Sequence, residues 1–290
     1  MSDTGINVRR LYFAVLAHAG DGLRTAVLDP WRAEHADTVR AALAPLARHG
    51  QWYRREYEFG DLLEIAYALS RVSDLLLLGF QPEPRPGEES SWRFHEPDAA
   101  IPELTTAEYL DFFGALGMTA VTPSAGDPFD PFLHEIADVE QAPDPAAPIQ
   151  PTATLWPGLT LGEMLFARAG VRVRAGTGHA VAGVADRSRL HESYLRRHRF
   201  ALDQSLGWGH NSQWKTDFRR DYRTADADHL CVDEDREFGG GQDAVGTCPD
   251  LDPELEISLL RNRCHLVPFP TGPGESAPGP GIWRMTIPRA

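Results

Sequence analysis

The sequence has no apolar run long enough to cross a bilayer and no apolar leader. Its longest apolar stretch, residues 72–80, falls well short of the roughly 20 residues that a transmembrane helix needs. The first ten residues are polar and lack the apolar core of a signal peptide. These two absences predict a cytoplasmic protein that does not bind membranes.

Cysteine and lysine are both scarce. The three cysteines, Cys231, Cys248 and Cys264, do not describe a disulfide framework in a chain of 290 residues, so reduced thiols are expected. Lys215 is the single lysine among 28 basic residues, which we attribute to genome composition bias. The formal net charge of −14 argues against general nucleic-acid binding, because such binding depends on neutralising phosphates.

The motifs of common enzymes are missing as well. The chain has no G-x-S-x-G turn, no Walker lysine loop, no G-x-G-x-x-G fingerprint and no H-E-x-x-H zinc motif. We therefore assign no catalytic residue, no cofactor and no metal ligand, and a protein without enzymatic activity is the favoured class. A catalytic constellation assembled from His198, His210 and distant acids stays open at this stage.

What the sequence does contain predicts an α+β fold. Hydrophobic residues make up 42% and charged residues 24% of the chain, as in ordinary globular proteins. The clearest helix covers residues 61–78, where apolar residues step by three and four. They form one stripe made of Leu62, Ile65, Leu69, Val72 and Leu76.

Two shorter helices carry start signals. Residues 105–116 begin with Thr105 or Thr106 as the cap, and residues 252–263 begin with Asp252 followed by a proline. Their apolar sides are Tyr109, Leu110 and Phe113 in the first helix, and Leu255, Leu259 and Leu260 in the second. Both helices are expected to pack through these sides.

From residue 117 the period changes to that of strands. Short segments rich in β-branched residues predict strands at 119–122, 136–140, 149–155 and 165–173. In the last segment Val171 and Val173 alternate with Arg172 and Arg174, which predicts one buried and one exposed face.

The chain is thereby predicted to have three regions. Residues 1–116 form a helical region with a Pro-rich loop at 81–102, residues 117–175 a small β-rich head, and residues 176–290 a mixed C-terminal extension. The first sixty residues give an irregular signal, with a short helix at 37–44 that proline interrupts. Residues 224–250 are acidic and glycine-rich and are interpreted as a loop.

Several motifs in this order resemble those of GrpE-type nucleotide exchange factors. Gly126 opens the segment GDPFDPFLHE, which resembles the family signature G-x-P-(F/L)-D-P-x-x-H. Residues 158–162 (GLTLG) resemble the G-Y-x-L hairpin of the family's head, and residues 165–173 (LFARAGVRV) resemble its final strand. Residues 61–71 resemble a helix of the family's bundle.

This resemblance, which covers residues 51–174, implies a head that contacts the ATPase domain of a DnaK-type chaperone. Family members favour the open, nucleotide-free form of that domain and so speed release of ADP. A partner that binds the open state better must weaken nucleotide binding by the same coupling energy, so no nucleophile or metal is required. The implied contact residues are Trp156, Leu159 and Leu161, with Arg168 as a rim charge. The alternative for each is a place in the β core.

Asp130, Pro131 and His134 are interpreted as architecture. At a bend, the aspartate carboxylate accepts local backbone amides while the proline fixes the turn, and His134 then begins the next strand. The chain departs from the family because it lacks the long N-terminal stalk used for dimerisation and continues for about 115 residues beyond the head. Dimerisation is left open. The alternatives are an inherited scaffold with a C-terminal metal-binding or enzymatic module, and an interaction protein without exchange activity.

Two features of the extension suggest sites. Aromatic residues recur every four positions beside arginines, in the set Trp214, Phe218, Arg219, Arg220 and Tyr222. This set is either an anion or partner patch of aromatic platforms and guanidinium forks, or the packed face of a helix. Soft zinc ligands also occur, namely His229, Cys231, Cys248, Cys264 and His265, but their spacing matches no standard zinc motif and the question is left open.

Overall fold

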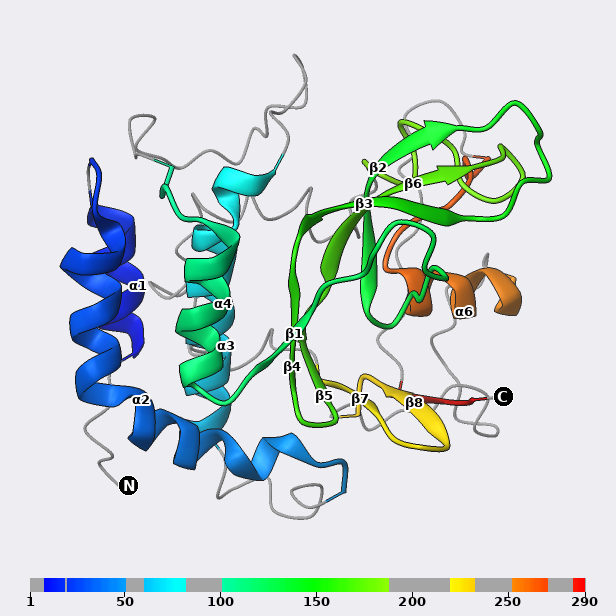
Figure 1. The fold of residues 1–290 in the computed structure, drawn as a ribbon. Coiled ribbons are helices and arrows are strands. Elements are labelled where there is room, and N and C mark those ends of the chain that lie inside the picture. The colour runs from blue at the N-terminus through cyan, green and yellow to red at the C-terminus, as the bar shows by residue number, and fades with distance from the viewer. Residues whose placement is uncertain are drawn as a thin grey trace. The chain divides into compact units, whose positions relative to one another are not determined.

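The computed structural model describes residues 8–18, 20–50, 60–81, 101–187, 220–232, 252–270 and 284–289. It shows helices together with two β-sheets, which confirms the α+β class (Figure 1). The described residues belong to two compact units. The first contains those up to Ala120 and Leu159–Gly162, and the second those in Val121–Gly158, Glu163–Leu195 and Arg219–Ala290.

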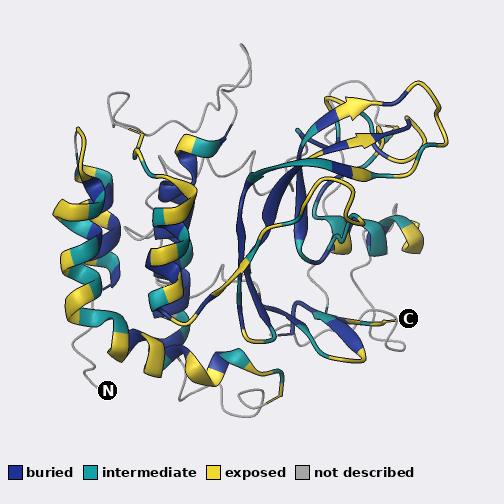
Figure 2. Cartoon of the chain, viewed as in Figure 1, coloured by how far each residue is buried: buried dark blue, intermediate teal, exposed yellow. Residues whose placement is uncertain are grey.

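The helices up to residue 120 make up most of the first unit. Its elements are α1 (Val8–Ala17), η1 (Arg24–Leu28), α2 (Asp29–Leu43), η2 (Ala44–Ala47), α3 (Gly60–Leu76), η4 (Leu78–Phe80) and α4 (Thr106–Ala115). Figure 2 shows α1, α2 and α4 with buried and exposed residues on opposite sides, as amphipathic helices require. No helix among the described residues has the length and apolar character needed to span a membrane.

The helix α2 is longer than the sequence predicted. It starts at Asp29 instead of residue 37, with Pro30 in its first turn, where a missing amide donor costs nothing. It ends at Leu43, and Pro45 lies in the 3₁₀ turn η2 that follows. Pro45 therefore ends the helix as expected, while the weak apolar pattern before residue 37 hid its beginning.

The helix α3 confirms the predicted helix of residues 61–78 but is buried on more than one stripe. Arg71, Ser73 and Asp74 are all buried. Ser73 Oγ lies 2.8 Å from the hydroxyl of Tyr109, and Arg71 Nη1 lies 3.9 Å from Asp74 Oδ2. The first contact satisfies two hydroxyl groups that would otherwise be costly to bury, and the second brings two buried opposite charges together.

The helix α4 confirms the predicted helix of residues 105–116 and shows which threonine caps it. Thr105 Oγ1 accepts the amide of Glu108 at 3.2 Å, and the Glu108 carboxylate accepts the amide of Thr105 at 2.9 Å. This reciprocal pair is a capping box. Tyr109, Phe112 and Phe113 are buried on its apolar side.

The strands form two sheets. The larger has the order β1-β4-β5-β7-β8-β9, where the strands are Thr119–Val121, Gly158–Leu161, Met164–Ala167, Asp221–Arg223, Ala227–Leu230 and Met285–Pro288. The smaller has the order β2-β6-β3, where the strands are His134–Gln141, Ala169–Ala175 and Gln150–Trp156. In the smaller sheet β6 runs parallel to β2 and antiparallel to β3.

Three predictions about the strands are wrong. Residues 165–173 are not one strand but parts of β5 and β6, which lie in different sheets. The expected loop at 224–250 contains β8, which pairs with β7 and β9. Tyr222 lies in β7 and not on a helix. A period-two pattern does not reveal a change of sheet, and strands of three or four residues are too short to show any period.

The second unit has two described clusters of buried apolar residues. One lies on the inner face of the smaller sheet and includes Ile136, Val171 and Val173. The other joins Phe132 and Leu165 of the predicted head to C-terminal residues, which are Leu230, Cys231, Leu260 and Met285. Leu260 belongs to α6 (Pro253–Asn262), a helix that Asp252 caps as predicted. These C-terminal residues therefore share a core with the head.

Candidate functional site

The four residues predicted to contact a partner are buried in the chain. Trp156, Leu159, Leu161 and Arg168 are each at most 4% exposed. The indole of Trp156 lies against Gly170, where an added Cβ would come within 2.1 Å of the ring. The expectation that these side chains face a partner is wrong for the described structure, and the alternative of a place in the core holds.

The turn at Asp130 is confirmed. Asp130 Oδ1 accepts the amide of Phe132 at 3.0 Å, and its carbonyl accepts the amide of His134 at 2.8 Å. The amide of Asp130 donates to His134 Nδ1 at 3.1 Å. Burial lowers the pKa of His134, and this outweighs the opposing charges of Asp130 and Asp127. A neutral imidazole with an unprotonated Nδ1 fits its role as an acceptor.

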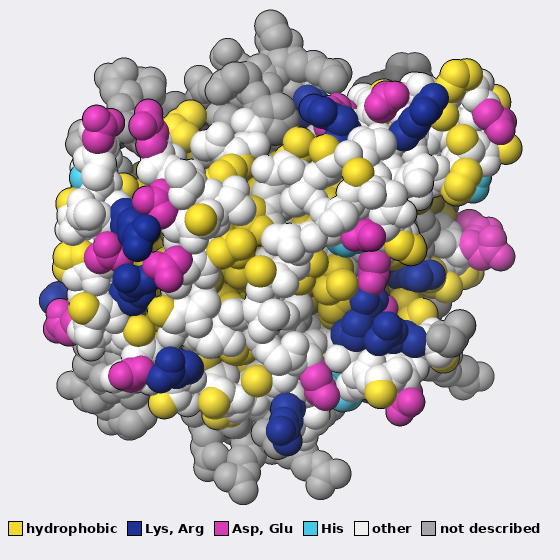
Figure 3. Space-filling view, in the orientation of Figure 1, with side chains coloured by type: hydrophobic (Ala, Val, Ile, Leu, Met, Phe, Trp, Pro, Cys, Tyr) yellow, Lys and Arg dark blue, Asp and Glu magenta, His cyan; other side chains and the backbone are white. Residues whose placement is uncertain are grey.

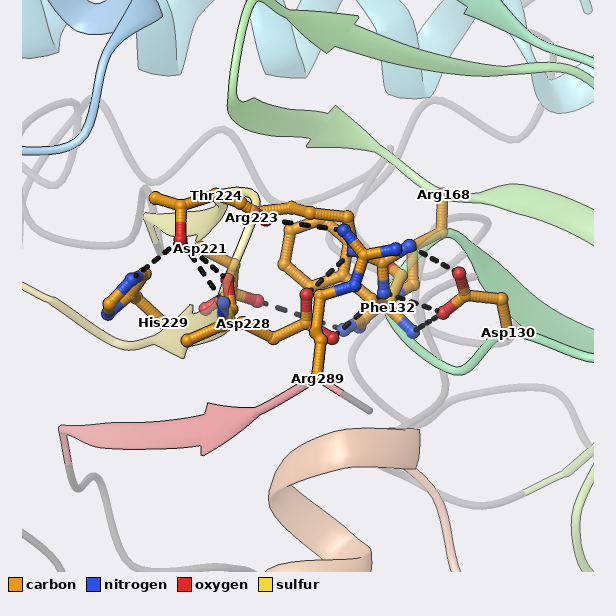
Figure 4. Close-up of polar contacts among 10 residues, drawn as sticks. Asp130, Phe132, Arg168, Asp221, Arg223, Thr224, Asp228, His229 and Arg289 are labelled. Carbon is orange, nitrogen blue, oxygen red and sulfur yellow. Dashed lines mark hydrogen bonds and ion pairs between the residues drawn. The ribbon is translucent and has the colours of Figure 1, made fainter.

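Asp130 has a second role that the sequence did not reveal. Its carboxylate forms a bidentate ion pair with Arg223, in which Nη2 lies 2.9 Å from Oδ1 and Nη1 contacts Oδ2 (Figure 4). Arg223 also donates to Asp228 from Nε at 2.6 Å and from Nη2 at 2.8 Å. Its guanidinium carbon lies 4.4 Å from the centre of the Phe132 ring. Arg223 therefore ties the head turn to the β7–β8 hairpin.

The charges of this cluster reinforce one another. Burial lowers the pKa of Arg223, but the hydrogen bonds and charges of Asp228 and Asp130 outweigh it, so the pKa is raised above its ordinary value. Burial raises the pKa of Asp130, but the hydrogen bonds and charge of Arg223 outweigh it, so the pKa is lowered. Both groups are thus charged at neutral pH.

A second arginine bridge lies beside the first. Arg168 Nε donates to the carbonyl of Phe132 at 3.0 Å, and Arg168 Nη2 lies 3.7 Å from Asp221 Oδ2. Asp221 Oδ1 accepts the amide of Cys231 at 2.9 Å. Both side chains of this ion pair are almost completely buried. Arg168 is therefore an internal link between β-elements instead of the rim charge that was expected.

The predicted anion patch is not assembled among the described residues. Trp214, Phe218 and Arg219 lie outside them. Arg220 is buried, and Tyr222 is buried in β7 opposite Met164. A strand places alternate residues on opposite faces, so Tyr222 does not continue a helical aromatic face.

The residues left open as zinc ligands are not gathered in the part of the chain that the structure describes. His229 Nδ1 lies 3.3 Å from Thr286 Oγ1, and its Nε2 lies 3.4 Å from Thr224 Oγ1. Burial raises the pKa of the Cys264 thiol to about 12, so the thiolate that zinc prefers is disfavoured. Cys248 lies outside the described residues. Among the residues that are described, no three His, Cys, Asp or Glu side chains lie close enough to hold a metal ion.

The exposed surface of the head, residues 117–175, is polar. The large exposed apolar residues of the described chain are Phe13, Ile101 and Val267, none of which lies in residues 117–175. The outer face of the smaller sheet instead carries two ion pairs. Arg172 Nε lies 2.6 Å from Asp138 Oδ2, and Arg174 Nε lies 3.8 Å from Glu140 Oε1. Figure 3 shows basic and acidic side chains side by side over β2 and β6.

Comparison with known proteins gives no relative. The chain matches no protein-family model, no curated protein and no solved structure.

Proposed function

We propose that the protein is a GrpE-like co-chaperone that binds the ATPase domain of a DnaK-type chaperone and promotes nucleotide exchange. The observation that carries this proposal is the ordered set of motifs in residues 117–175. Support comes from the turn at Asp130, which has the hydrogen bonds that its D-P-x-x-H pattern favours. The same stretch holds the six strands β1 to β6.

A head of this kind acts by binding and needs no reacting group. If it fits the open, nucleotide-free ATPase domain better than the closed one, its binding energy shifts the population toward the open form. Binding of the head then lowers the affinity of the ATPase domain for ADP. Bound ADP lowers the affinity of the domain for the head by the same factor. The rigid links at Arg223 and Arg168 serve this mechanism, because a head that deformed to fit either form would discriminate less between them.

The test measures this reciprocity directly. The full chain is titrated into labelled DnaK-type ATPase domains, each in nucleotide-free and ADP-bound forms. We expect binding to the nucleotide-free form to be at least about fivefold tighter, which is the lower end of typical allosteric coupling. The affinity for ADP, measured with and without the protein, is expected to change by the same factor.

Two outcomes would reject the proposal. The first is that none of the ATPase domains forms a complex with the chain. The second is that both nucleotide states bind equally well, because a partner with equal affinity for two states shifts neither. The second outcome would leave an interaction protein without exchange activity.

A further inference from the structure

One end of the smaller sheet differs from the polar surface of the rest of the head. Three segments meet there, namely the β2–β3 connection (residues 142–149), the turns that follow β6 (residues 175–185) and the chain after α6 (residues 264–270). Asp144 is the single Asp, Glu, Lys or Arg in them, although such residues make up 24% of the chain. Figure 3 shows mostly hydrophobic side chains over the β2–β3 connection, at the upper right. We call the exposed residues of these three segments the neutral end.

Backbone hydrogen bonds join the three segments. The amide of Gly176 donates to the carbonyl of Ala147 at 2.8 Å, and the amide of Val181 donates to the carbonyl of Leu266 at 2.8 Å. Each segment also supplies one residue to the apolar cluster of the smaller sheet, and these residues are Ile149, Ala180 and Leu266. The segments, which are far apart in the sequence, therefore lie side by side.

The β2–β3 connection is held in a fixed shape. Asp144 Oδ1 accepts the amide of Ala146 at 2.9 Å, and the Asp144 carbonyl accepts the amide of Ala147 at 3.1 Å. An added Cβ at Gly176 would lie 2.2 Å from the carbonyl oxygen of Pro145, so glycine is required for this close approach. Prolines, which fix their own φ angles, occupy positions 143, 145 and 148. A surface that is ordered before binding loses little conformational entropy when it binds.

The neutral end exposes apolar groups. Val267, which is 39% exposed, is one of the large exposed apolar residues of the described chain. Small apolar residues are exposed as well, among them Pro143, Pro145, Ala146, Pro148, Pro268 and Pro270. Exposed apolar groups without charges are typical of the core of a protein interface, which a polar rim surrounds. Glu140 and Arg174, which pair at the border of the neutral end, supply charges for such a rim.

The chemistry of the neutral end selects an uncharged partner surface. A nucleic acid or an acidic segment needs cations, and the three segments contain no Lys or Arg. A strongly charged partner would lose water from its charges without gaining opposite charges. A second copy of the chain meets the requirement, because a two-fold axis places the same uncharged surface on both sides of the contact. Two chains with a net charge of −14 repel each other, and contact through the neutral end keeps that repulsion low.

We propose that the neutral end is the surface through which two copies of the chain associate as a symmetric dimer. Most of its exposed apolar groups are small, so the dimer dissociates on dilution, with a dissociation constant in the micromolar range. The inference goes beyond the proposed function and does not depend on it, because no ATPase domain takes part in the contact.

Sedimentation velocity of the full chain tests the proposal, at concentrations from about 1 to about 200 μM, where micromolar association is resolved. The sedimentation coefficient of wild type should rise with concentration from that of a monomer toward that of a dimer. Val267→Asp and Ala146→Asp each add a charge to both sides of the contact, from different segments. Each should raise the dissociation constant at least about tenfold, because like charges then face each other across the two-fold axis.

Ile101→Asp is the matched control. Ile101 is 41% exposed, close to the 39% of Val267, and lies outside the three segments. The substitution adds the same charge in place of a similar side chain and should leave association unchanged. Circular dichroism verifies that each variant is folded. Val267 and Ala146 are both exposed, so a variant that failed to fold would be replaced by the other.

Salt separates this contact from one made by ion pairs. Raising sodium chloride from about 20 to about 500 mM should strengthen wild-type association or leave it unchanged, because screening reduces the repulsion between two acidic chains. An association that weakens with salt would overturn the proposal, since ion pairs outside the neutral end would then hold the dimer.

Three further results would overturn it. They are a wild type that stays monomeric at every concentration, equal dissociation constants for wild type and both variants of the neutral end, and equal weakening by Ile101→Asp. A monomeric wild type whose complex with a DnaK-type ATPase domain is weakened by Val267→Asp would assign the surface to that partner instead. Failure of the dimer leaves the exchange proposal intact, and failure of exchange leaves the dimer intact.

Discussion

At the scale of single residues, Arg223 links two carboxylates that are far apart in the sequence. Asp130 belongs to the head turn and Asp228 to β8, and both bind the same guanidinium group. Arginine suits this position because its planar fork offers five donors, whereas lysine offers only a point charge. The segment that contains Arg223 is visibly basic, but composition does not indicate which acids an arginine will meet.

Asp130 is expected to make the free energy of unfolding depend on pH in the acidic range. Arg223 lowers the pKa of Asp130 below its ordinary value of 3.8 in spite of burial, so its stabilising effect is complete above that value and lost as the pH falls below it. The variant Asp130→Asn should lower the free energy of unfolding at neutral pH by about 1–2 kcal/mol and should lose less stability between about pH 5 and pH 3. Urea unfolding across this range measures both effects.

Asp226→Asn is the matched control, because Asp226 is exposed in the β7–β8 hairpin. It should follow the wild-type pH dependence. Parallel curves for wild type and Asp130→Asn would contradict the role assigned to the Arg223 pair.

The contact between Gly170 and Trp156 gives a second prediction at this scale. An added Cβ at position 170 would overlap the indole ring, which is buried and cannot move freely. Gly170→Ala should lower the free energy of unfolding by about 1–3 kcal/mol, as overpacking does. Gly114→Ala in α4 is the control, since nothing lies within 4 Å of its added Cβ. It should be neutral or stabilising, and equal losses in both variants would refute the account.

At the scale of elements, local signals predicted α3, α4 and α6 but missed α1 and the first part of α2, and they predicted strands unevenly. The caps at Thr105 and Asp252 and the stripe of α3 depend on neighbouring residues, so the sequence contains them. The pairing of β8 with β9 joins residues more than fifty positions apart. Such pairing depends on the tertiary fold, which local periodicity does not encode.

The capping box of α4 can be tested against the neighbouring threonine. Thr105→Ala removes the hydroxyl that accepts the Glu108 amide and should lower the free energy of unfolding by about 1 kcal/mol. Thr106→Ala changes an exposed residue in the first turn and should have less than half that effect. Chemical denaturation compares the two. A larger loss of stability for Thr106→Ala than for Thr105→Ala would show that the cap has been assigned to the wrong threonine.

The candidate site was predictable only in part. The turn at Asp130 follows from the chemistry of Asp-Pro bends, and the structure confirms it. The burial of Trp156 and Arg168 was not predictable, because a strand pattern identifies two faces without showing what covers them. The exposure of Arg172 and Arg174 was predictable from their alternation with buried valines. Which residues of β3 lie beside them depends on strand pairing, which the sequence does not show.

At the scale of the whole molecule, the described C-terminal strands and helix are part of the head's own structure. Strands β7, β8 and β9 extend the larger sheet beyond β5. Leu230, Leu260 and Met285 complete the apolar cluster around Phe132 and Leu165. The described parts of the extension therefore complete the sheet and the apolar cluster of the head.

This arrangement predicts the behaviour of a truncated chain. A protein ending at Ala175 would expose one side of Phe132 and Leu165 and leave Asp130 and Arg168 without Arg223 and Asp221. We expect it to lose cooperative thermal unfolding and the near-ultraviolet circular dichroism of packed aromatic residues. The full chain is the reference. A truncated protein with a sharp transition and an unchanged aromatic spectrum would show that the head folds by itself.

The central claim is that the head, held by its C-terminal strands, promotes nucleotide exchange. The most direct measurement is the rate at which fluorescent ADP leaves a DnaK-type ATPase domain, followed by stopped flow with increasing concentrations of the full chain. The account predicts that the release rate rises and reaches a plateau as the complex saturates. A release rate that stays constant while a complex demonstrably forms would contradict it.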